Sequence, residues 1–125
     1  MPVFRLIYVS RVARQVRFAD AEAIAQGAVE RNTANGLSGM LVYTPSHFIQ
    51  VLEGEESLVR ATLARIRNDP RHTDLQVLDA RLVAARQFDR WAMVAHHHHE
   101  PGHGSQPLNL ERALEILQRA GKGEP

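Results

Sequence analysis

The sequence predicts an α+β domain built on a ferredoxin-like sheet, and three observations support this. Strand-like and helical segments follow one another in the order βαββαββα. The turn signal Thr44-Pro45-Ser46 separates two strand-like segments, which therefore form a hairpin. Without the last strand and helix, the order βαββαβ is that of an antiparallel sheet with two helices on one face. We expect the last helix to be an addition to that arrangement.

The first half of the chain is expected to hold a strand near residues 3–10, a helix over 20–32 and the hairpin strands 40–43 and 48–52. Asp20 is a good N-cap for the helix, because its carboxylate can accept from the free N–H groups of the first turn. A basic loop over residues 11–17 precedes it. Gly36 and Gly39 are expected to break the chain before the hairpin begins.

The second half is expected to hold a helix from Gly54 to Asp69, strands over 74–83 and 88–95, and a helix over 108–119. The dipeptide Asp69-Pro70 ends the first of these helices, since the residue before proline disfavours the helical conformation. The last helix has an apolar stripe that either packs on the open sheet face or forms a self-association surface. The predicted organisation is a domain over 1–95, a His/Gly/Pro-rich linker over 96–107 and a helical tail over 108–125.

Composition excludes several classes of protein. The chain has 125 residues, enough for one domain with one core. Its net charge of +1, with acids and bases interspersed, argues against nucleic-acid binding. It contains no cysteine, and no apolar run approaches the roughly 20 residues of a membrane span. A cytoplasmic protein is expected. The histidines at 96–99 and 103 lack the rigid ligand set of a fixed metal site.

Three neutral polar residues interrupt apolar faces. Gln50 shares a strand face with Phe48 and Leu52, because side chains alternate along a strand. Tyr8 lies near the end of an apolar stripe of the first strand, and Asn32 continues the apolar stripe of the first helix. Each can be a satisfied core group, and asparagine also suits a helix C-terminus. Together they indicate a pocket between two helices and a sheet.

A pair of charged residues and three apolar ones complete the predicted pocket. Arg65 and Asp69 are four residues apart on the second helix, which is also typical of a surface ion pair worth less than about 1 kcal/mol. The apolar walls are predicted to be Ile24, Leu52 and Ile66. Amides, a phenol, a guanidinium and a carboxylate between apolar walls suit a planar heteroaromatic ligand with alternating donors and acceptors, such as a flavin.

On these residues the sequence resembles the BLUF domains, blue-light sensors that use flavin. The matching blocks are Leu6–Ser10, Arg31-Asn32, Gly36–Leu41, Phe48–Gly54, Arg65-Ile66, Asp69–His72 and Phe88–Met93. They occur in the family's order between residues 4 and 93. The resemblance implies a short, single-domain photoreceptor that binds flavin non-covalently and is not an enzyme.

The resemblance also implies roles for single residues. Tyr8 would donate an electron to the excited flavin, and Gln50, between the two, would rearrange its hydrogen bonds. Asn32 would contact the flavin, and Arg65 and Asp69 would lie at the ring edge.

Three further residues take expected roles from the same blocks. His72 joins the flavin-binding residues, while Trp91 and Met93 would report the state of the glutamine outward. FAD is the expected cofactor, with FMN and riboflavin as alternatives. The output is expected to pass to an unidentified downstream protein or through a homo-oligomer.

Three other functions fit the predicted fold less well. An acylphosphatase-like hydrolase needs a phosphate-binding loop after the first strand, normally with glycines, and residues 11–19 contain none. An RNA-binding sheet needs aromatic residues on an exposed face in basic surroundings. A regulatory module that has lost its flavin would not be expected to retain the pocket residues.

Overall fold

One five-stranded sheet organises the protein, in a computed structural model that describes residues 2–88, 93–97 and 109–121. Its elements are β1 (Val3–Val12), α1 (Phe18–Ala34), β2 (Ser38–Tyr43), β3 (His47–Gly54), α2 (Glu56–Arg67), β4 (His72–Val83), β5 (Met93–His97) and α3 (Leu110–Gly121). The strand order is β4-β1-β3-β2-β5. The α+β class predicted from the sequence is confirmed.

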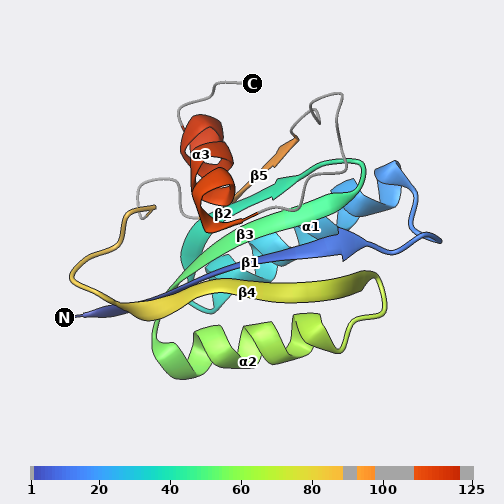
Figure 1. Ribbon diagram of the computed structural model, residues 1–125. Helices are drawn as coiled ribbons and strands as arrows, with labels where there is room; N and C mark the ends of the chain where they lie inside the picture. The colour runs from blue at the N-terminus through green and yellow to red at the C-terminus, as the bar shows by residue number, and fades with distance from the viewer. Residues whose placement is uncertain (1, 89–92, 98–108, 122–125) are drawn as a thin grey trace.

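The sheet has an antiparallel part and one parallel addition. Strands β2, β3, β1 and β4 pair antiparallel, whereas β5 joins the edge at β2 in parallel. Helices α1 and α2 cover one face, and α3 lies on the other (Figure 1). None of the helices in the described part of the chain is long and apolar enough to cross a membrane.

Strand β3 is buried on both faces because helices cover both sides of the sheet. Phe48 and Leu52 pack toward α1 and α2, while Ile49 and Val51 belong to the cluster under α3. This is the alternation expected of a strand. The apolar stripe of α3 packs on the open sheet face, which is one of the two roles predicted for it. The buried residues of the helix are Ala113, Ile116, Leu117 and Ala120.

The start of α1 differs from the prediction. The helix begins at Phe18, so Arg17 is its N-cap and Asp20 lies in the first turn. The Asp20 carboxylate accepts from the backbone N–H of Arg17 at 3.2 Å. Asp20 therefore completes a capping box from inside the helix, where its charge also favours the positive end of the helix dipole.

The start of β2 also differs, because Gly39 lies inside the strand and not before it. Its φ is +146°, and a Cβ on this residue would lie 2.0 Å from the carbonyl oxygen of Val51 on β3. Glycine therefore permits a close approach of the two backbones while the pairing continues.

The last elements begin later than predicted. The strand expected at 88–95 is β5, Met93–His97; Phe88 is instead buried in the core cluster under α3. The helix expected from residue 108 begins at Leu110, where the side chain of Asn109 accepts from the N–H of Arg112 at 2.9 Å. Trp91 lies outside the described residues, as do residues 98–108.

Candidate functional site

Tyr8 and Gln50 form a buried pair on the face that α1 and α2 cover. They stand opposite each other in the β1–β3 register, and both are at most 1% exposed. The phenol donates a hydrogen bond of 2.5 Å to Oε1 of Gln50. Burial raises the pKa of the Tyr8 phenol far above its ordinary value, so the hydroxyl keeps its proton. The oxygen end of the amide thus faces Tyr8, and the nitrogen end points elsewhere.

Two buried amide nitrogens have no hydrogen-bond partner within the described residues. They are Nε2 of Gln50 and Nδ2 of Asn32, whose side chains are 0% and 1% exposed. Each orphaned donor costs about 1–3 kcal/mol relative to a satisfied one. One strand position and one helix position therefore hold N–H groups for which the described residues supply no acceptor. A ligand with carbonyl oxygens can supply them.

A cavity of about 210 Å³ opens between the two helices and the sheet. Its lining comes from every element on this face: Tyr8, Ile24, Ala28, Arg31, Leu41, Gln50, Arg65, Ile66, Asp69, Arg71 and His72. The strands contribute the polar pair, and the helices contribute aliphatic walls and the charged groups. Polar edges between apolar walls are the general character of cofactor sites.

Most of the predicted pocket residues line this cavity, and two do not. Asn32 is buried near the end of α1, with its orphaned donor, but is not among the lining residues. Leu52 is packed in the core two residues beyond Gln50. Sequence reasoning did not assign Arg31 or Arg71 to the site, although both line it. Arg31 precedes Asn32 in a matching block, so its position was the available signal.

The predicted neighbours Arg65 and Asp69 are not an ion pair. Asp69 is bound by Arg71 through Nη2 at 2.6 Å and Nε at 2.9 Å. This hydrogen bonding lowers the pKa of Asp69 to about 2, so the carboxylate is charged at neutral pH. Arg65 lines the cavity and makes no ion pair with any residue that the structure describes. Its guanidinium keeps its donors for a ligand or for water.

His72 forms an aromatic part of the cavity wall at the start of β4. Its Nδ1 lies 2.8 Å from Oγ of Ser10, and its ring centroid lies 4.5 Å from that of Phe48. Burial lowers the pKa of His72; the charge of Asp69 opposes this and that of Arg71 adds to it. The lowered pKa favours the neutral ring, so His72 adds an uncharged side chain to the cavity lining.

The sequence matches a known protein family. The family model described as BLUF, sensors of blue-light using FAD, matches residues 3–94. The chain belongs to the BLUF family. It is a BLUF blue-light sensor of the kind that uses flavin, and the two orphaned amide donors fit the carbonyl-bearing edge of a flavin ring.

The BLUF match extends to relatives of very different length. The chain is 32% identical over 91 residues to photoactivated adenylate cyclase subunit beta of Euglena gracilis. That match covers 72% of this chain but 11% of the cyclase subunit, so the chain spans about a tenth of that relative. The similarity lies in the BLUF part.

Two solved BLUF structures have similar folds. The photo-activated state of BlsA has a TM-score of 0.76 and 25% identity, with 95% of this chain and 94% of BlsA covered. Klebsiella pneumoniae BlrP1, solved with FMN and cyclic diGMP, has a TM-score of 0.69 and 30% identity. That match covers 94% of this chain and 30% of BlrP1.

Of the two residues expected to report outward, Trp91 lies outside the described residues, and Met93 is described only by its place in the sheet. Met93 opens β5, where its backbone pairs with Gly39 of β2. Gly39 in turn pairs with Leu52 of β3, two residues from Gln50. The backbone of β5 is thus one strand removed from the strand that carries the glutamine.

Proposed function

We propose that this protein is a blue-light photoreceptor in which Tyr8 and Gln50 form a hydrogen-bond switch. One observation carries the proposal. The buried phenol donates to one end of the Gln50 amide, while the other end has an orphaned donor beside a ligand-sized cavity. A buried amide with one satisfied and one unsatisfied end is suited to exchange between two arrangements.

The cavity residues suit a flavin ring. A bound flavin supplies the absorption of blue light and accepts an electron when excited. Nε2 of Gln50 and the Arg65 guanidinium offer donors from the cavity lining. Nδ2 of Asn32, which is buried outside that lining, offers a further donor to a ring carbonyl. Ile24 and Ile66 line the cavity with aliphatic surface that excludes water from the ring. We assign FAD as the cofactor, with FMN or riboflavin able to present the same ring.

The protein's part in the switch is a redistribution of hydrogen bonds. In the dark arrangement Tyr8 keeps its proton and donates to Oε1 of Gln50. With flavin bound and excited, Tyr8 would give up an electron to it and pass its Oη proton toward Gln50, and both would return to Tyr8 once the amide presents its ends differently. A new hydrogen bond to the ring lowers its excitation energy slightly, which appears as a red shift. The output is a changed population of conformers.

The signal is proposed to leave through the last strand to another protein or to a second copy of this chain. β5 carries Met93 and leads toward α3, and Trp91 precedes it in sequence. The proposed route therefore joins the photoactive strand to the sheet edge at β5.

The direct test is the absorption spectrum of the purified protein in the dark and under blue light. We expect a yellow protein whose flavin bands shift reversibly to longer wavelength and recover in the dark. A protein that retains no flavin after reconstitution with FAD, FMN or riboflavin would contradict the proposal. So would a flavin-loaded protein with an unchanging spectrum.

Replacing Asn32 with Ala should weaken flavin binding by roughly tenfold or more, because a ring acceptor would lose its buried donor. The flavin-free variant should still fold, since Nδ2 has no hydrogen-bond partner among the residues that the structure describes. Fluorescence titration with FMN measures the binding, and circular dichroism checks the fold. Asn35→Ala, at the exposed C-cap three residues on, is the matched control and should bind as wild type does. Equal affinity in Asn32→Ala would remove Asn32 from the site.

A further inference from the structure

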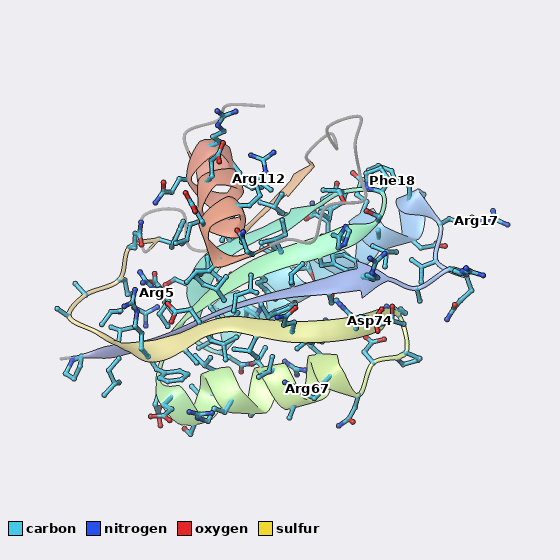
Figure 2. The ribbon with its side chains drawn as sticks, viewed as in Figure 1. Arg5, Arg17, Phe18, Arg67, Asp74 and Arg112 are labelled. Atoms are coloured by element: carbon cyan, nitrogen blue, oxygen red, sulfur yellow. The ribbon has the colours of Figure 1, made fainter. Side chains whose placement is uncertain are left out.

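A row of polar side chains crosses the sheet on the face of α3. Glu53 of β3 stands opposite Ser38 of β2 on one side and Arg5 of β1 on the other. Arg5 pairs in turn with Arg81 of β4. Figure 2 places Arg5 at the end of the sheet where the chain leaves β4, away from Asp74 at the opposite end. This polar row lies where the chain must cross from β4, at one edge, to β5 at the other.

The polar row binds the first residues of that crossover. The Glu53 carboxylate accepts from the backbone N–H groups of Gln87 at 3.0 Å and Phe88 at 2.8 Å. Arg86 donates to Oγ of Ser38 at 2.6 Å and to the carbonyl oxygen of Glu53 at 3.1 Å. Arg5 donates to the side chain of Gln87 at 2.8 Å. Three strands thus hold one short segment in place.

Glu53 is the central member of the row and an unusual one. Its side chain is 0% exposed, and it makes no ion pair with any described residue. A buried carboxylate needs several donors, and here two consecutive backbone N–H groups supply them. The bonds serve both partners, because they satisfy the buried carboxylate and hold the backbone of Gln87 and Phe88 against β3.

Phe88 connects this anchor to α3. Its side chain is 1% exposed and belongs to the same buried cluster as Ala113 and Leu117 of α3. Glu53 is three residues from Gln50 on β3, and odd and even positions of this strand face opposite sides. The strand therefore carries the photoactive amide on one face and the anchor of the crossover on the other.

We propose that Glu53 is a positioning residue for the light signal: it seats Phe88 beneath α3 and couples β3 to that helix. The coupling to light rests on the proposed function of Gln50, whereas the anchoring of α3 does not. A displacement of β3 at Gln50 shifts Glu53, and the crossover segment and Phe88 move with it. Helix α3 then repacks on the sheet face.

Glu53→Gln tests the proposal, because it keeps the shape but removes the charge and replaces the carboxylate oxygen that accepts from Gln87 at 3.0 Å with an NH₂ group, which cannot accept. Flavin content and the light-induced shift should be retained, since Tyr8 and Gln50 lie on the other face. Hydrogen exchange of residues 110–121 should become about tenfold faster in the dark, and its change on illumination should be lost. Glu30→Gln, the same change at an exposed position of α1, should behave as wild type.

Two further variants keep the test decisive if Glu53→Gln does not fold. Arg86→Gln removes the second clamp and should speed exchange in α3 in the same direction but by less. Glu53→Asp keeps the carboxylate and should restore part of the protection. Wild-type exchange rates of α3 in both Glu53→Gln and Arg86→Gln would overturn the anchor. A wild-type spectral shift without any change in α3 would overturn the coupling alone. Absence of the shift in wild type would instead refute the proposed function.

Discussion

Gln50→Leu is expected to bind flavin and to show no light-induced red shift. Leucine has a similar volume and suits a side chain that is 0% exposed among apolar neighbours, so the fold should survive. The substitution also removes Nε2, which has no hydrogen-bond partner in the described part of the chain. What disappears is the side chain able to exchange donor and acceptor ends between Tyr8 and the ring. Difference spectra recorded with and without blue light measure the effect.

The control for this variant is Gln26→Leu on the exposed surface of α1, which should keep the full shift. Flavin occupancy, read from the ratio of flavin to protein absorbance, separates a lost switch from a lost cofactor. A flavin-loaded Gln50→Leu protein with the wild-type shift would refute the hydrogen-bond switch.

Tyr8→Phe should abolish the same shift for a different reason. It removes only the hydroxyl, which is the proposed source of the electron and proton, and leaves Oε1 of Gln50 without its 2.5 Å donor. An unsatisfied buried acceptor costs about 1–3 kcal/mol, so the variant should be less stable but folded. Flavin fluorescence should rise, because the excited ring loses its nearby electron donor.

The second tyrosine of the chain provides the matched control. Tyr43 lies on β2, stacks against Phe18 with ring centroids 5.6 Å apart, and is not among the residues that line the cavity. Tyr43→Phe should keep both the shift and the low fluorescence. A persistent shift in Tyr8→Phe would mean that the phenol is not the donor. Equal behaviour of both variants would remove any special role for the Tyr8–Gln50 bond.

Periodicity predicted the positions of the central site residues, because it depends only on the local sequence. Alternation places Gln50 on the face of Phe48 and Leu52, and helical spacing places Asn32 on the buried side of α1, as the structure has them. The partners were harder to predict. Tyr8 meets Gln50 because the β1–β3 register sets them opposite each other, and register is a property of the assembled sheet.

The contacts that were not predicted lie at the ends of helices and strands and in the turns between them. The spacing of Arg65 and Asp69 predicts adjacency only within a helix, and α2 ends at Arg67 with Asn68 as its C-cap. Asp69 therefore lies in the turn, where Arg71 can fold back onto it. The contacts of Glu53 were not predicted for a related reason. A carboxylate beside Gly54 resembles a strand end at the surface, and its donors come from Gln87 and Phe88, 34 and 35 residues away in sequence.

The order of the cavity-lining residues along the chain has a consequence for biosynthesis. They all fall between Tyr8 and His72, whereas the parallel strand β5 and α3 come later. The ribosome therefore delivers the described residues that line the cavity before the segment that pairs with β2 exists. Strands β1 to β4 can pair before β5 is made, because all four precede it in the chain. The cofactor can therefore bind a nascent chain in which β5 and α3 have not yet been synthesised. Its binding then stabilises the part that has already folded.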